Sequence, residues 1–141
     1  MNEIPTIITE RVDDVSLLLE QMQRMGLPTL LDTHFPTHGT WTGLSLGWVS
    51  TIWLSSILSR GDHRLVHVEP WVAQRLWTLE TTTGQAVTRR DFTDDRLEIV
   101  LRCLSDDTRW AACESVLNQH TVRVDDLSTA RVHVDSPSAS A

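Results

Sequence analysis

The stretch from Thr42 to Arg60 constrains the fold most, because its pattern predicts one helix that is apolar on nearly every face. Its apolar centre, Leu44 to Leu58, would span about 22 Å as a helix, against about 30 Å for a membrane core. The same centre carries several hydroxyl side chains, and Gly61 marks its end. We therefore expect a buried central helix and no membrane-spanning segment. Its apolar side chains include Trp48, Val49, Ile52, Trp53, Ile57 and Leu58.

Shorter amphipathic helices are expected around this central one. After Asp14, apolar side chains recur at helical spacing until Gly26. Pro28 can open a short second helix, because its missing N–H costs nothing at a helix start, and residues 35–39 break it. A further helix is predicted from Pro70 to Gly84. The stripe of the first helix consists of Val15, Leu18, Leu19, Met22 and Met25.

Two later helices share one type of N-terminal signal. Thr93 and Ser105 each place a hydroxyl before two aspartates, a typical N-cap followed by favourable charge at the positive end of the helix dipole. Apolar stripes follow both, so we expect a helical hairpin. Its second helix begins with Asp106 and Asp107, which would repel phosphates, so DNA reading by a helix-turn-helix is disfavoured. The stripes are Leu97, Val100, Leu101 and Leu104, then Trp110, Cys113, Val116 and Leu117.

The hydrophobic period changes from 3.6 to 2 beyond His120. Val122 and Val124 alternate with polar residues, and the alternation returns in Arg131–Ser136. The predicted fold is therefore mainly α: a domain of about six helices over residues 1–120, followed over residues 121–141 by the first strands of a second domain.

Charge and cysteine content limit the partners and the compartment. The net charge of −7 disfavours non-specific DNA binding, which depends on cations that displace counterions. Arg89 and Arg90, with Arg60 and Arg64, are the best candidates for phosphate contacts, the alternative being that they pair with nearby acids. The two cysteines, which lack a Cys-x-x-Cys pattern, and the absence of a signal-like N-terminus indicate a cytoplasmic protein.

Metal-ligating residues are few. His63 and His67 would share a helix face beside Asp62, but with no clear third ligand a solvated loop is the stronger interpretation. Asp135 lies on the predicted strand together with His133, and alternation alone favours an exposed acid at a strand end there. Two-metal phosphoryl transfer requires several carboxylates on rigid strands, and one cannot hold both ions.

Several segments together resemble a known family. Leu27–Leu31, the Trp-rich stretch 42–60, Phe92–Leu97 and above all Arg131–Ser136 resemble the N-terminal part of bacterial insertion-sequence transposases of the DDE class. The resemblance implies a helical N-terminal domain before a ribonuclease-H-like catalytic domain that carries out DNA transposition, a form of DNA recombination. It further implies that Asp135 is the first carboxylate of the Asp-Asp-Glu triad and, in an intact enzyme, a ligand of a divalent metal, expected to be Mg²⁺.

The chain also departs from that family. Pro137 restricts Ser136 and removes a ladder donor where the family has small hydroxyl residues. The second Asp and the Glu lie far downstream in such transposases, so we expect a truncated transposase that is catalytically incomplete by itself. The alternative is a stand-alone helical interaction module, with Trp71 or Trp77 as anchors, that forms a homodimer or inhibits a full-length transposase. A small regulator that binds the DNA ends of the element is a further alternative, weakened by the acidic charge.

Overall fold

A computed structural model describes residues 9–125, with side chains described through Gln119. This part of the chain is mainly helical, as predicted, and contains no strand. The α-helices are α1 (Val15–Arg24), α2 (Leu27–His34), α3 (Leu46–Arg60), α4 (Val68–Ala73), α5 (Leu76–Thr83), α6 (Asp94–Leu104) and α7 (Asp107–Asp125), and two short 3-10 helices are η1 (Leu65–His67) and η2 (Arg89–Phe92).

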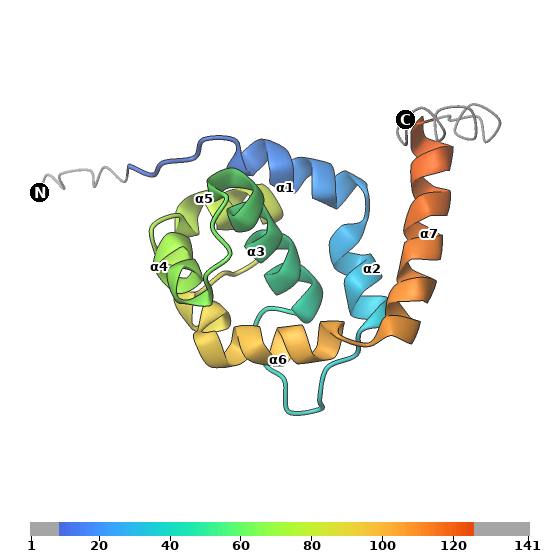
Figure 1. The fold of residues 1–141 in the computed structure, drawn as a ribbon. Coiled ribbons are helices and arrows are strands. Elements are labelled where there is room, and N and C mark those ends of the chain that lie inside the picture. The colour runs from blue at the N-terminus through green and yellow to red at the C-terminus, as the bar shows by residue number, and fades with distance from the viewer. Residues whose placement is uncertain (1–8, 126–141) are drawn as a thin grey trace, which may run out of the picture.

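Helix α3 runs through the middle of the fold, with the other helices arranged around it (Figure 1). Val49, Ile52 and Ser55 are fully buried, which confirms the predicted central helix. Two of its buried hydroxyls bond to its own backbone: Thr51 Oγ1 donates to Gly47 O at 2.7 Å and Ser55 Oγ donates to Ile52 O at 2.6 Å. These internal bonds satisfy the two hydroxyls within an apolar helix, whereas the buried Ser50 Oγ has no partner among the described residues.

The start of α3 lies four residues later than the predicted Thr42. Gly43 has φ of 81°, a left-handed conformation that ends any helix there. The Leu44 N–H instead donates to Asp91 Oδ1 at 3.1 Å, so this segment is tied to a distant part of the chain. Ser45 then acts as the N-cap, its Oγ accepting from the Trp48 N–H. Apolar periodicity could not show this boundary, because Leu44 is buried outside the helix.

The single helix predicted from Pro70 to Gly84 is two helices, α4 and α5, with a break at Arg75. Arg75 leaves helical geometry (φ −132°), and its guanidinium donates to the backbone oxygens of Arg11 and Trp71. Glu10 accepts hydrogen bonds from the first free N–H groups of α5, at 2.7 Å from Thr78 N. A carboxylate at this position satisfies helix-start donors, so the new N-terminus is stabilised by the arm before α1.

The two predicted caps of the later helices have different outcomes. Thr93 caps α6, with its Oγ1 accepting from Arg96 N, as expected. Ser105 does not cap α7; its hydroxyl donates to Arg102 O at 2.6 Å. Asp106 takes that role and accepts from Arg109 N at 3.0 Å. Both Ser and Asp are good N-caps, so the sequence could not discriminate between adjacent ones.

The predicted hairpin of the last two helices is wrong, because α7 packs along α2 and turns away from α6 (Figure 1). The contact is made by Phe35 and Trp110, whose ring centroids lie 4.8 Å apart. Arg109 adds a hydrogen bond to His34 O at 3.2 Å. The stripe on α7 is accordingly only partly buried: Cys113 is buried, whereas Val116 is 44% exposed.

Helix α7 continues through Asp125, so the strand expected at Val122 and Val124 is wrong. Two alternating valines form too short a pattern to favour a strand here. A helix that is already nucleated gains one backbone hydrogen bond for each residue that it adds, so α7 extends through them. The strand predicted for Arg131–Ser136, with Asp135, lies outside the described residues.

Helices α2 and α3 approach each other most closely at Gly47. A Cβ on this glycine would lie 2.0 Å from Pro28 O and 2.9 Å from the Asp32 carboxylate. The same carboxylate accepts from Gly47 N and Ser45 Oγ, both at 2.7 Å, and so holds the N-terminus of α3 against α2.

We predict that Gly47→Ala destabilises the protein by about 2 kcal/mol, since overpacking against a backbone oxygen costs about 3 kcal/mol while alanine improves helix propensity by about 1 kcal/mol. Urea unfolding followed by circular dichroism measures this. Gly39→Ala is the control, because nothing lies within 4 Å of its added Cβ. Equal stability of the two variants would contradict the close approach.

Candidate functional site

The segment Phe92–Leu97, which supports the family resemblance, has a structural role. Phe92 and Leu97 are completely buried, and Thr93 caps α6. The Arg96 guanidinium lies 3.9 Å from the ring centroid of Trp41 and donates to Leu44 O at 3.3 Å. This segment therefore joins α6 to the start of α3 through its buried residues, whereas Asp94 and Asp95 are exposed and help to line a pocket with Val66, Glu69 and Pro70.

Asp91 is the centre of that junction. Its Oδ1 accepts from Leu44 N, and its Oδ2 accepts from Thr88 N at 3.0 Å and Thr88 Oγ1 at 2.9 Å. Asp91 is 6% exposed, so these donors have no ready replacement in water. Arg96 lies 3.8 Å from Oδ1 and balances the buried charge.

The predicted phosphate contacts Arg89 and Arg90 both lie in η2. Arg89 Nη2 is 2.9 Å from Glu69 Oε1. This arginine therefore pairs with a nearby acid, which is the alternative to a phosphate contact given by the sequence. Arg90 is exposed and has no ion pair with the described side chains. Arg64 pairs with Asp62 at 3.1 Å.

His63 and His67, the possible metal ligands, lie in a turn that is held by hydrogen bonds to Asp62. His67 Nδ1 lies 2.5 Å from Asp62 Oδ2, and this bond, followed by those from Arg64, holds the pKa of Asp62 well below its usual range. His63 is exposed. Across residues 9–119 no group of three or more His, Cys, Asp or Glu side chains is placed to hold a metal ion. Asp135, the metal ligand implied by the resemblance, lies outside the described residues.

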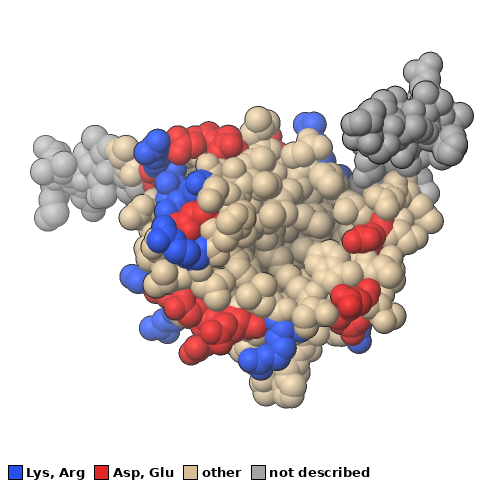
Figure 2. All heavy atoms as spheres, in the orientation of Figure 1, with Lys and Arg blue, Asp and Glu red and all other residues tan. Residues whose placement is uncertain are grey.

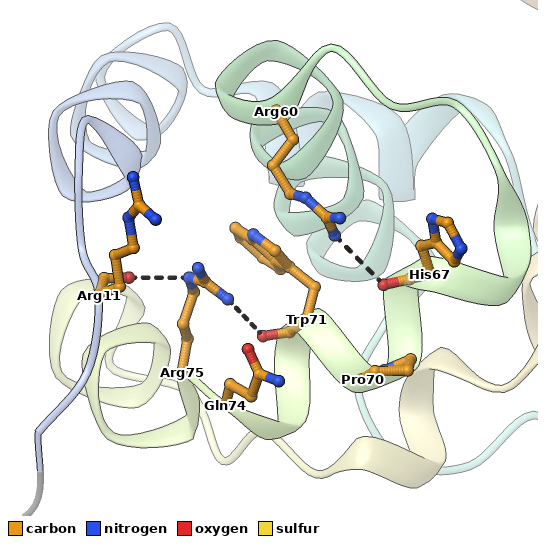
Figure 3. Close-up of a pocket in the computed structure, with 7 residues that line it drawn as sticks. All are labelled: Arg11, Arg60, His67, Pro70, Trp71, Gln74 and Arg75. Atoms are coloured by element: carbon orange, nitrogen blue, oxygen red, sulfur yellow. Dashed lines mark hydrogen bonds between the residues drawn. The ribbon is translucent and has the colours of Figure 1, made fainter.

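One pocket gathers three arginine side chains from three parts of the chain. It has a volume of about 380 Å³, and the side chains of Arg11, Arg60 and Arg75 lie around the Trp71 ring (Figure 3). No carboxylate is among its described lining residues. We call it the arginine pocket; it is lined by Arg11, Arg60, His67, Pro70, Trp71, Gln74 and Arg75.

Arg75 is the fixed member of this pocket. It is only 8% exposed, and its guanidinium carbon lies 4.7 Å from the ring centroid of Trp71. Its Nε donates to Arg11 O at 2.8 Å and its Nη1 to Trp71 O at 3.1 Å, both neutral carbonyls. Burial, followed by repulsion from Arg60, lowers the pKa of Arg75. The pocket therefore contains a buried positive charge that the described carboxylates do not neutralise by direct contact.

Sequence analysis anticipated Arg60 but missed Arg11 and Arg75. These residues are 64 positions apart in the chain and meet only because the N-terminal arm crosses the break between α4 and α5. An isolated arginine within a predicted helix gives no signal that the helix breaks at that residue. Trp71, proposed as an exposed anchor, is 3% exposed and packs in the core; Trp77 is 63% exposed as expected.

A second hollow lies between α2 and α7. It has a volume of about 450 Å³, and its lining is predominantly apolar. Val116 is its most exposed large apolar side chain, and Thr29 is exposed on the opposite wall. We call it the α2–α7 groove; it is lined by Met25, Gly26, Thr29, Leu30, Thr33, His34, Val116 and Leu117.

Comparison with known proteins found no matching family, no matching curated protein and no matching solved structure. Within residues 9–125, every helix is too short or too polar to cross a membrane.

We predict that Asp91→Asn destabilises the protein by about 2 to 3 kcal/mol, because the amide NH₂ would face N–H donors that then remain unsatisfied. Urea unfolding measures the change. Asp95→Asn, on an exposed position in the first turn of α6, should cost no more than about 0.5 kcal/mol. If Asp91→Asn were as mild as this control, the junction would not depend on the carboxylate.

Proposed function

We propose that the described helices form a non-catalytic N-terminal module of an insertion-sequence DDE transposase, and that this module joins two copies of the chain through the α2–α7 groove. The observation that carries the proposal is the apolar groove itself, with Val116 exposed beside it.

Two features support the family part of this proposal. Two of the segments that resemble the transposases are Leu27–Leu31 and Phe92–Leu97. They form part of α2 and the junction at Asp91, so the resemblance in this region concerns residues that maintain the helical fold. The catalytic part of the resemblance rests on Asp135 alone, as the first triad carboxylate and a Mg²⁺ ligand. We therefore assign transposition chemistry to the region around Asp135 and a docking role to the helices.

Charge supports a second copy as the occupant of the groove. Each chain carries a net charge of −7, so two copies repel each other and associate only where the contact buries enough uncharged apolar surface to outweigh that repulsion. Apart from the titratable His34, the described lining of the groove carries no ionisable side chain. On the face shown in Figure 2 the centre is uncharged, and acidic side chains are visible on the side where α7 lies. Depletion of charge at the centre is typical of stable protein interfaces.

Symmetry makes self-association geometrically simple. In a two-fold dimer the same surface is used twice, so a residue beside the groove in one copy can enter the groove of the other. Val116 projects from α7, and α2 forms the other wall. The same surface would let this chain form mixed dimers with a full-length transposase and so inhibit it.

We predict that Val116→Glu weakens self-association of the full chain at least about tenfold, because it places a charge in a buried apolar contact. Sedimentation velocity over a concentration series measures the monomer fraction. Thr29→Glu should have the same effect from the other wall, and its exposed position avoids any loss of folding.

The matched control is Leu101→Glu, since Leu101 on α6 is 47% exposed against 44% for Val116 but lies outside the groove. It should associate like the unmodified chain. A chain that stays monomeric at high concentration, or a dimer that both groove variants leave intact, would overturn this proposal.

A further inference from the structure

We infer that the arginine pocket binds a phosphate group, carried either by a small molecule or by the DNA backbone. The pocket shares no residue with the α2–α7 groove, so this inference does not rest on the proposed dimer.

Arg75 provides a preorganised cation at the base of the pocket. Its two hydrogen bonds to backbone carbonyls and its position against Trp71 fix the guanidinium. A guanidinium has five N–H donors, and these bonds use two of its nitrogens, so donors remain for an anion. A buried cation is normally paired with a carboxylate, and in the described residues Arg75 makes no such ion pair. Asp13 and Glu10 act on its charge without a direct ion pair, so an anionic ligand in the pocket would give Arg75 the direct partner that these carboxylates do not.

Arg60 and Arg11 add cations that are free to adjust. Arg60 reaches His67 O at 3.5 Å and Asp62 at 3.6 Å, both long contacts that hold it weakly. The Arg11 side chain is 81% exposed and, among the described residues, pairs with the nearby Asp13. Exposed ion pairs of this kind contribute little, so either arginine can turn toward a ligand at small cost.

The chemistry of these groups favours phosphate. A guanidinium can donate two parallel hydrogen bonds to a phosphate, and three guanidinium groups offer enough donors for its several oxygens. Figure 2 shows blue side chains gathered where the N-terminal arm meets α4 and α5, with red side chains among and beside them. An anion that enters the pocket would compete with these carboxylates for Arg11 and Arg60. The Trp71 ring borders the pocket and reduces competition from water.

The direct test is a titration of the full chain with sodium phosphate at constant ionic strength, maintained with sodium chloride and followed by amide chemical shifts. We expect saturable shifts at Gln74 and Arg75. Arg60→Gln should weaken phosphate binding about fivefold or more, the effect of losing one charge-assisted hydrogen bond. Arg11→Gln should act in the same direction. Arg75→Gln is avoided as the primary variant because Arg75 also holds the N-terminal arm.

Arg90→Gln is the matched control, since it removes one positive charge from an exposed position outside the pocket. It should leave the phosphate affinity unchanged. Shifts that chloride reproduces, or an equal loss of affinity in the Arg90 and Arg60 variants, would show diffuse charge screening and overturn the inference.

A second titration distinguishes the two sources of phosphate. If a short DNA duplex competes with phosphate and causes the same shifts at Gln74 and Arg75, the pocket takes the DNA backbone. If phosphate binds and the duplex does not compete, the ligand is a small phosphorylated molecule. Both outcomes retain the phosphate site, whereas duplex binding that leaves these residues unaffected and shows no phosphate competition counts against it.

Discussion

The fold depends on covering most sides of α3, and only a narrow face with Leu54 and Leu58 stays exposed. Its buried apolar residues face several directions, so no single neighbouring helix can cover it. The chain meets this constraint with contacts at both ends of the helix. Asp32 and Asp91 hold its start through hydrogen bonds from Gly47 and Leu44, and Ser59 near its end donates to Asp14 at 2.7 Å. Most charged residues are therefore exposed, and the buried Asp91 and Arg75 lie where a loop or the N-terminal arm meets the helices.

The sequence predicted helices well where the period of the apolar residues agreed with the residues that begin or end a helix. The helices over 15–24 and 27–34 follow directly from a stripe, a proline and a glycine. The errors fall where a distant residue decides the boundary. Asp91 engages Leu44 across 47 positions, so α3 begins late, and Glu10 reaches Thr78 across 68 positions, so α5 can begin after a break. Local propensity carries no information about such partners.

The candidate sites were less predictable for the same reason. Arg60 was identified as a possible phosphate contact, but its companions Arg11 and Arg75 become neighbours only after the arm crosses the α4–α5 break. Arg89 was chosen for its adjacency to Arg90, yet Glu69, 20 positions away, neutralises it. Val116 belonged to a predicted core stripe and is instead half exposed, because α7 packs on α2 through Trp110 and Phe35.

The separation of the two candidate surfaces has a physical consequence. The arginine pocket is built on the N-terminal arm, the end of α3, η1 and the α4–α5 break, whereas the groove is built on the α1–α2 turn, α2 and α7. A positive surface attracts an anionic ligand from a distance, while an apolar groove stabilises a partner only on contact. Because no residue is common to both, occupation of one surface need not compete with occupation of the other. A dimer formed through the groove would therefore retain both of its arginine pockets and could present two phosphate sites at once, which raises the effective affinity for any ligand long enough to reach both.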